Sequence, residues 1–367
     1  MQGYSIGVAV AIAAMASTGC GGGGESQAAS GGQSAGGQSA GGRSSGGQSS
    51  GGSSGGSLSA GGSSSGGASS GGTSGGTGGA SGVAGGIAQK YPGDIGIGTD
   101  ADVIFADDFE SYADASKLWD RWDNTFQAAQ TRIATESANV YAGNQALEFT
   151  LPPLTQELSN AVQKVLTTEL DMMYLRWYSK FDLNNDIVGS SHNGGGMSAH
   201  YFIGSMATPG IPADGTNKFL TEYEHWRGDV TTAAPGQLNV YIYHPEQRDV
   251  YGDHFFPTGL VMPNTSLPYD FGPDFVPQSD VIPELGRWYC YEYMVKANTP
   301  GLRDGRITLW LDGKQIADFG NLRLRDIDTL KIDRFNLSFH ARSNPKETKK
   351  YYDNVVAAKS YIGPMAP

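Results

Sequence analysis

One stretch of the sequence carries polar and aromatic side chains that could bind a hydrophilic ligand. Residues 174–181 alternate between polar and apolar types, and alternate side chains of a strand point to opposite faces of its sheet. Tyr174, Arg176, Tyr178 and Lys180 therefore share one face. Two interpretations stay open: this face is ordinary solvated surface, as in any half-buried antiparallel sheet, or it is the floor of a cleft for an anionic ligand. The tyrosine rings would suit flat sugar rings.

A second chemistry is offered by Glu222 and Glu224, which lie two residues apart in a predicted strand. Two carboxyl groups on one strand face suit glycoside hydrolysis, and a retaining enzyme needs them about 5–5.5 Å apart. The same alternation places Tyr223, His225 and Arg227 on the opposite face of the strand. Only one of these two sets can therefore face a cleft.

The elements that must position these side chains are predicted to be nearly all strands. The absence of βαβ alternation indicates an all-β, two-sheet antiparallel sandwich or jelly roll. Asp312 followed by Gly313 predicts a hairpin turn. Only residues 154–165 have a helical pattern, and residues 255–285 predict a long irregular loop rich in Pro, Gly and Asp. The expected strands are 103–105, 129–135, 146–149, 171–181, 198–204, 219–227, 238–243, 288–297, 306–311, 332–339 and 351–357.

The N-terminal part has the pattern of targeting and linker sequence. Residues 1–19 predict a secretory signal, because a short apolar run ends in small residues. Cys20 resembles the cysteine of a bacterial lipobox, which predicts lipidation and anchoring to the outer membrane and cell surface of a Gram-negative bacterium. An ordinary cleaved signal is the alternative. Residues 20–95 are rich in Gly and Ser and predict a disordered linker. Residues 96–367 then form one domain.

The composition excludes several classes of function. The chain of 367 residues has a formal net charge of −12, which argues against a nucleic-acid partner. The histidines lack zinc-ligand spacing, and the glycine-rich runs lack the Lys–Ser/Thr pair of a phosphate loop. Of the two cysteines, Cys290 lies in an aromatic run and is expected to be a buried thiol. We expect a monomer whose membrane contact is the lipid anchor alone.

The order of several motifs resembles the alginate and glucuronan lyase group of polysaccharide lyases, which have a concanavalin-like jelly-roll domain. The resemblance spans nearly the whole folded domain and implies a concanavalin-like β-jelly roll that acts on an acidic polysaccharide. The matching segments are Asp-Asp-Phe-Glu at 107–110, Leu-Arg-Trp-Tyr-Ser-Lys-Phe-Asp at 175–182, the Gly-rich turn at 189–196, His-Trp-Arg at 225–227, Val-Tyr-Ile-Tyr at 240–243, Val-Lys-Ala-Asn-Thr-Pro-Gly at 295–301, Leu-Trp-Leu-Asp-Gly at 309–313 and Tyr-Asp-Asn-Val at 352–355.

The resemblance also implies a reaction and its residues. Such lyases cleave uronate polymers by β-elimination, which needs neutralisation of the carboxylate, removal of the C5 proton and protonation of the leaving oxygen. Tyr241 and Tyr243 match paired tyrosines of the family, whereas His192 stands where the family has a lysine. The expected catalytic residues are Tyr243, Tyr241 and His192. The expected substrate-binding residues are Arg176, Tyr178, Lys180, His200, Tyr223, His225 and Arg227.

Two other functions stay open at this point. A non-catalytic, lectin-like module would use the same aromatic cleft, and a jelly-roll glycoside hydrolase would use Glu222 and Glu224. Elimination chemistry itself requires no cofactor. Glu110 and Asp353 are expected to meet on the far side of the domain. There they would hold a structural Ca²⁺, with backbone carbonyls completing an oxygen-rich shell.

Overall fold

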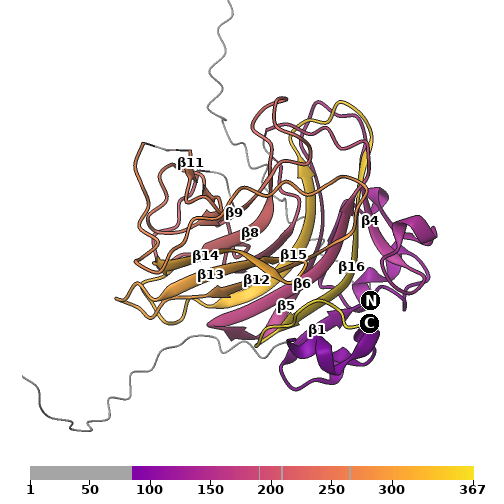
Figure 1. The fold of residues 1–367 in the computed structure, drawn as a ribbon, viewed down its shortest axis with the longest axis horizontal. Coiled ribbons are helices and arrows are strands. Elements are labelled where there is room, and N and C mark those ends of the chain that lie inside the picture. Colours follow the sequence, from indigo (N-terminus) through magenta and orange to yellow (C-terminus); the bar gives the residue numbers. More distant parts are fainter. Residues whose placement is uncertain (1–84, 190, 208–209, 264–265) are drawn as a thin grey trace, which may run out of the picture. The chain divides into compact units, whose positions relative to one another are not determined.

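Two antiparallel sheets pack together and form the folded part of the chain (Figure 1). The computed structural model describes residues 85–189, 191–207, 210–263 and 266–367. Within these residues each sheet has 8 strands, and the helical elements are short 3₁₀ helices. The prediction of an all-β, two-sheet antiparallel fold is confirmed.

Sheet A has the strand order β14-β13-β12-β6-β16-β4-β3, and β1 pairs with β16. Its central strands, β6 and β12, pair antiparallel along the whole of β12. The strands of sheet A are β1 (Val103–Asp107), β3 (Thr131–Ala134), β4 (Ala146–Leu151), β6 (Met172–Phe181), β12 (Tyr289–Lys296), β13 (Gly305–Leu311), β14 (Lys314–Leu322) and β16 (Thr348–Ala358).

Sheet B has the strand order β11-β10-β9-β8-β7-β15-β5-β2. Here β8 and β9 form an antiparallel pair, and β7 joins β8 to β15. The strands of sheet B are β2 (Asn124–Phe126), β5 (Leu158–Leu170), β7 (Gly195–Ala199), β8 (Phe219–Trp226), β9 (Gln237–Tyr243), β10 (Asp253–Phe255), β11 (Val261–Met262) and β15 (Ile332–Ala341).

The core lies between the sheets and is dense in aromatic side chains. Trp177 of β6 stacks on Tyr291 of β12, with ring centroids 5.6 Å apart, and meets Tyr223 of β8 edge to face at 5.9 Å. Each of these side chains is nearly fully buried, and burying a large apolar side chain stabilises a fold by about 1.5–3 kcal/mol. This packing decides which face of β8 points inward.

The outer face of sheet A is covered by both terminal segments of the described chain. The backbone N–H of Ala88 donates to the carbonyl of Ile362 at 2.8 Å, and that of Gly93 donates to Ala366 at 2.8 Å. The indigo N-terminal segment accordingly lies beside yellow β16 (Figure 1). Residues 85–95, assigned to the linker from sequence, are therefore part of the folded unit. The 3₁₀ helices are η1 (Ile87–Lys90), η2 (Pro92–Asp94), η3 (Ile97–Thr99), η4 (Ala115–Asp120), η5 (Ala128–Gln130) and η6 (Ser137–Asn139).

Two local expectations can be compared directly with the observed elements. The predicted hairpin is present, because Asp312 and Gly313 connect β13 to β14 with φ values of 50° and 76°. The helical prediction for residues 154–165 is wrong, since this run enters β5, which pairs with β15 from Leu158 onward. Pairing along β15 satisfies the backbone groups of the run and overrides its weak helical periodicity.

Two further predictions differ in detail from the observed elements. The strand expected at 198–204 lies earlier, at β7, and the described residues between β7 and β8 contain no strand. The described part of the loop expected at 255–285 is irregular except near its start, where the end of β10 pairs with β11. The short strand β10 extends sheet B beyond β9, and it brings one more side chain to the site described below.

The predicted signal peptide, Cys20 and the linker up to residue 84 lie outside the described residues. In the part of the chain that the structure does describe, no helix has the length and apolar character to cross a membrane. Cys290 is a buried free thiol, as expected, and burial raises its pKa to about 12.

Candidate functional site

The outer face of sheet B carries a cluster of titratable side chains. On β8, Tyr223 belongs to the hydrophobic core, whereas Glu222 and Glu224 point to the opposite side. On β9, Val240 and Ile242 are core residues, so Tyr241 and Tyr243 share the outer face with the glutamates. Of the two sets of β8 side chains that could face a cleft, the structure therefore places Glu222 and Glu224 on the outer face and Tyr223 in the core. We name His192, Glu222, Glu224, Tyr241, Tyr243, His254 and His340 the outer-face cluster.

His192 is at the centre of the outer-face cluster. Its Nδ1 lies 2.8 Å from Oε2 of Glu224, and its ring centroid lies 4.9 Å from that of Tyr241 and 5.3 Å from that of His340. Burial alone would lower the pKa of His192, but the charge of Glu224 and the hydrogen bond to it prevail and raise that pKa above its ordinary value. Because Nδ1 is held by Glu224, Nε2 remains to meet a ligand.

The turn that carries His192 is fixed by hydrogen bonds from three directions. The backbone N–H of His340 donates to the carbonyl of His192 at 2.6 Å, and the backbone N–H of His225 donates to Oδ1 of Asn193 at 3.0 Å. Behind the turn, the buried amine of Lys350 donates to the carbonyl of Asn193. At Gly194 a Cβ atom would overlap the carbonyl oxygen of Tyr223, so only glycine fits this close approach.

Glu222 is a buried carboxyl group with one oxygen available. The side-chain amide of Asn336 donates to Oε1 at 3.1 Å, while Oε2 has no hydrogen-bond partner. Burial, reinforced by the charge of Glu224, raises the pKa of Glu222 to about 8, although His192 opposes this. Glu222 is therefore largely protonated at neutral pH and can donate a hydrogen bond from its carboxyl group.

The two tyrosines lie side by side next to the glutamates. The ring centroids of Tyr241 and Tyr243 are 5.7 Å apart. The backbone N–H of Gly252 donates to Oη of Tyr241 at 3.0 Å. Burial raises the pKa of Tyr241 well above its ordinary value, and it also raises that of Tyr243. Both phenols are therefore protonated and are suited to donate a proton.

The two other histidines of the outer-face cluster are neutral. His254 of β10 lies 2.9 Å from Oδ1 of Asn239 and 3.8 Å from Oε1 of Glu224. His340 of β15 lies 2.6 Å from Oγ of Ser159 through its Nδ1. Burial, assisted by the positive charge of His192, lowers the pKa of both His254 and His340 to about 3.

A pocket opens on this face between β5, β8 and β15. Among the described residues its lining has aromatic, amide, hydroxyl and carboxyl side chains, and it includes neither a lysine nor an arginine. The lining residues are Phe126, Glu157, Ser159, Asn160, Ala161, Gln163, His192, Tyr201, Phe202, Leu220, Glu222, Asn336, Ser338 and His340.

Three of the predicted substrate-binding residues lie on the other sheet. The guanidinium of Arg176 is buried on the outer face of sheet A, where it pairs with Asp94 beneath the N-terminal segment. Oη of Tyr178 accepts a hydrogen bond from the backbone N–H of Met365 at 2.8 Å. The amine of Lys180 donates to the carbonyl of Ala138. The structure does not bring these three side chains to His192.

The other predicted binding residues are also apart from the outer-face cluster. His225 points into the core, where its Nε2 lies 3.2 Å from Oη of Tyr291. Tyr223 packs against the ring of the same Tyr291. Arg227, at the end of β8, donates to Asp186 at 2.6 Å. His200 lies in the turn after β7, 3.2 Å from Oε1 of Glu169. Of the predicted site residues, His192, Tyr241 and Tyr243 are the ones that meet.

The expected calcium ligands bind backbone groups of one loop. Oε1 of Glu110 accepts from the N–H groups of Asn144 and Gln145, at 2.6 and 2.7 Å, and Oδ2 of Asp353 accepts from that of Tyr141 at 2.9 Å. Burial, reinforced by Glu110, raises the pKa of Asp353 to about 8. Within the described residues, no group of three His, Cys, Asp or Glu side chains could hold a metal ion.

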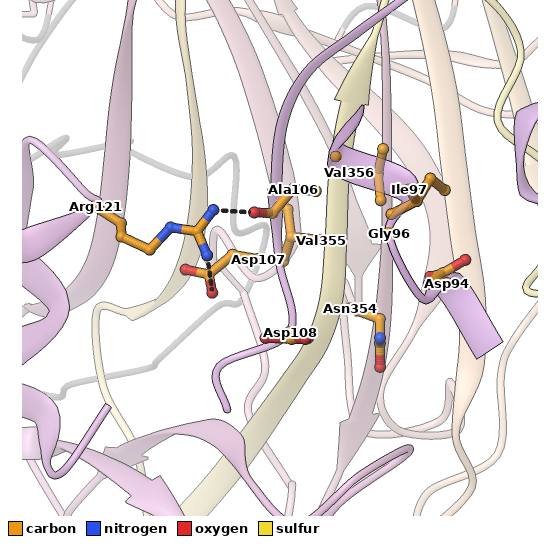
Figure 2. A pocket seen from close by; sticks show the side chains of 11 residues that line it. Asp94, Gly96, Ile97, Ala106, Asp107, Asp108, Arg121, Asn354, Val355 and Val356 are labelled. Carbon is orange, nitrogen blue, oxygen red and sulfur yellow. Dashed lines mark hydrogen bonds and ion pairs between the residues drawn. The ribbon is translucent and has the colours of Figure 1, made fainter. Parts of the chain in front are cut away.

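A second hollow lies close by on the outer side of sheet A (Figure 2). Arg121 reaches across it to Asp107 and to the carbonyl of Ala106. Asp107 in turn accepts from Oη of Tyr112 and from Nε1 of Trp122, the latter at 2.8 Å. Arg121 and Asp107 are thus held by partners within the fold.

Sequence reasoning missed His254, His340 and Asn336. For β15 a signal existed: Phe335, Leu337 and Phe339 alternate with polar residues, and they all belong to the core. Strict alternation therefore places Asn336 and His340 on the outer face. No comparable signal marked His254, because β10 has only 3 residues in a run that is otherwise irregular.

The two-sheet antiparallel fold has a counterpart among solved structures. The chain is similar to the solved structure of alginate lyase Aly36B, with a TM-score of 0.51 and 19% sequence identity over 71% of this chain and 98% of that one. It is also similar to a mutant of Aly36B solved in complex with alginate trisaccharide, with a TM-score of 0.50, 19% identity and coverage of 71% and 99%.

These likenesses confirm the jelly-roll fold that the motif order implied. No protein-family model matches the sequence. No curated protein matches it either.

Proposed function

We propose that this domain cleaves a uronate-containing polysaccharide by β-elimination on the outer face of sheet B. The observation that carries the proposal is the pair of His192 and Glu224, 2.8 Å apart, beside the protonated phenol of Tyr241. A base and an acid within reach of one sugar ring are what elimination requires. The jelly-roll fold shared with an alginate lyase supports the same class of reaction.

The geometry suggests a role for each group. Glu224 accepts a hydrogen bond from Nδ1–H of His192, which leaves Nε2 as the base that removes the C5 proton. Tyr241 then protonates the leaving O4, because its raised pKa keeps the phenol protonated. Tyr243 packs against Tyr241 and positions its ring. These assignments favour Tyr241 over Tyr243 as the acid, since Tyr241 is the tyrosine in contact with His192.

Absorbance near 235 nm tests the proposal, because elimination creates a C4–C5 double bond conjugated with the carboxyl group. The full chain would be incubated with alginates, glucuronan and polygalacturonate. We expect a rise in absorbance that Tyr241→Phe and His192→Gln reduce by about 10²–10⁴-fold, the range of acid–base catalysis. Tyr178→Phe is the matched control, because it removes the same hydroxyl from the other sheet. An unchanged rate in Tyr241→Phe would contradict the assignment.

A second candidate is hydrolysis of a glycosidic bond by Glu222 and Glu224. It is favoured by one observation: both carboxyl groups face the open side of sheet B, and the pKa of Glu222 is about 8, as suits a general acid. New reducing ends without absorbance at 235 nm, lost in Glu222→Gln, would identify a hydrolase. Binding of polysaccharide with neither product would identify a lectin-like module.

For the location of this activity we propose the outer surface of a Gram-negative cell. The support is the sequence pattern around Cys20, which is typical of a lipidated cysteine after a secretory signal. Incorporation of labelled palmitate by the full chain, lost in Cys20→Ala, is the expected result.

The partner we propose is an acidic polysaccharide, bound by a monomer. Light scattering of the purified protein would test the monomeric state.

A further inference from the structure

The chemical form of the substrate's carboxyl group decides what an elimination site must contain. Removing the C5 proton places negative charge on the adjacent carboxyl group. If that group is a free carboxylate, the charge adds to an existing one, so a cation or strong donors must offset it. If the group is an ester, it starts uncharged and needs one hydrogen-bond donor at its carbonyl oxygen. The two substrate forms therefore require different surroundings.

The pocket of the outer-face cluster is built for an uncharged group. Its lining within the described residues has neither lysine nor arginine. The positive charge favoured on His192 is offset by Glu224, which lies 2.8 Å from its Nδ1. Glu222 is largely protonated and adds no positive charge, whereas Glu157 adds a further carboxyl group. A substrate carboxylate would therefore meet no unpaired cation among these lining residues, in a buried and poorly screened setting where a charge needs a partner.

Two basic side chains lie behind residues of this face, and neither lines the pocket. The amine of Lys218 donates to the carbonyl of Met206 and lies 4.8 Å from the ring centroids of both Tyr201 and Tyr243. The guanidinium of Arg334 pairs with Asp333 at 2.9 Å and donates to Gln163 at 3.2 Å. The amine of Lys218 is thus held by a carbonyl and two rings, and the guanidinium of Arg334 by a carboxylate and an amide.

Two more basic side chains are separated from the pocket by the fold itself. Lys350 lies behind the turn, where its amine donates to Asn193 and lies 4.0 Å from the ring centroid of Phe181. Arg176 is paired with Asp94 on the outer face of the other sheet. Among the described lining residues, the charge that a free uronate requires is therefore limited to His192, and Glu224 already offsets that charge.

We propose that the reacting uronate carries an esterified, uncharged carboxyl group, so that the preferred substrate is an alkyl-esterified polyuronate. This inference rests on the proposed lyase function. It narrows the substrate class to a neutral form of the acidic polymer.

The reaction balances without any further reactant. Nε2 of His192 takes the C5 proton, the C5–H electron pair forms the C4–C5 double bond, and the C4–O4 bond breaks. The leaving O4 takes the phenolic proton of Tyr241, and the proton on His192 returns to Tyr241 through solvent. During the step the ester carbonyl oxygen becomes more negative, and Glu222 supplies the donor, because its Oε2 is unpaired and its pKa is about 8.

Paired substrates test the inference. Polygalacturonate, alginate and glucuronan would each be prepared as a methyl ester and as the free acid, and initial rates at 235 nm would be compared near neutral pH against protein-free blanks. We expect the rate on at least one ester to exceed that on its free acid by at least tenfold. An equal or higher rate on the free acids overturns this inference and leaves the lyase function standing. No elimination from either form overturns both.

A charge placed in the pocket provides a second test with a matched control. Phe126 lines the pocket and is half-buried, so Phe126→Lys adds a cation there without filling the core. We expect the ratio of ester rate to acid rate to fall at least threefold. Ile95→Lys adds the same charge at an exposed position outside the pocket lining and should leave the ratio unchanged. A constant ratio in Phe126→Lys would contradict the electrostatic argument.

Discussion

Replacing Glu224 by Gln tests the central contact of the site. In the native protein the carboxylate lies 2.8 Å from Nδ1 of His192 and is itself buried. A hydrogen bond that involves a charged group contributes about 1.5–3 kcal/mol, which corresponds to about 10- to 150-fold in rate. Glutamine keeps the shape but loses the charge, so we expect the maximal rate to fall within that range.

The pH dependence of the same variant gives an independent readout. Glu224 raises the pKa of His192 against the opposing effect of burial, so removing its charge lowers that pKa. A base must be unprotonated to act, and the rate therefore rises as the pH passes the pKa of His192. In Glu224→Gln we expect this rising limb to move to lower pH. The assay is the initial rate at 235 nm across about pH 5–9 on the best polymer of the panel.

Glu169→Gln is the matched control, because Glu169 also lies beside a histidine, 3.2 Å from Nε2 of His200. That pair is outside the pocket, so both the rate and the position of the limb should stay unchanged. A limb that moves to higher pH in Glu224→Gln, or one that stays in place with a normal rate, would refute His192 as the base.

Three further outcomes concern stability. Asp94→Asn should destabilise the fold by about 3–5 kcal/mol in urea denaturation, because the buried guanidinium of Arg176 loses its carboxylate partner. The double variant with Arg176→Met should recover part of this loss. Folding raises the pKa of Glu222 to about 8, so the folded protein favours the protonated carboxyl group. The stability that this preference contributes is fully present below about pH 4.3, the pKa of an unperturbed Glu, and is lost as the pH rises through 8. Glu222→Gln should therefore melt higher than the native protein at pH 9 and lose this advantage towards pH 5. The calcium ion predicted at Glu110 and Asp353 would have to displace the backbone N–H groups that these carboxylates accept from; if it binds there, CaCl₂ raises the melting temperature, EDTA reverses the increase, and neither Asp353→Asn nor Glu110→Gln responds.

Alternation along strands is the part of the site that the sequence could predict. It correctly grouped Glu222 with Glu224, and Tyr241 with Tyr243, because a strand repeats every two residues. It could not say which group faces inward. That choice depends on Tyr223 packing against Trp177, a residue of the opposite sheet, and such a contact is not visible in one strand.

The polar face of β6 shows the same limit. Arg176, Tyr178 and Lys180 do share one side of the strand, as predicted, but the sequence held no sign of what covers it. The cover comes from Asp94 and from the C-terminal Met365, far away along the chain. Local patterns therefore predicted the strands well, whereas the partners of buried charges depended on contacts across the fold.

The closure of two described segments over sheet A has a practical consequence for attaching the domain to a sensor surface. The bonds from Ala88 to Ile362 and from Gly93 to Ala366 keep the first and last described segments on the side opposite the outer-face cluster. A biotin tag or a resin linkage placed on either of these segments would therefore attach on the side away from the pocket. The pocket would then stay exposed to a viscous polymer solution.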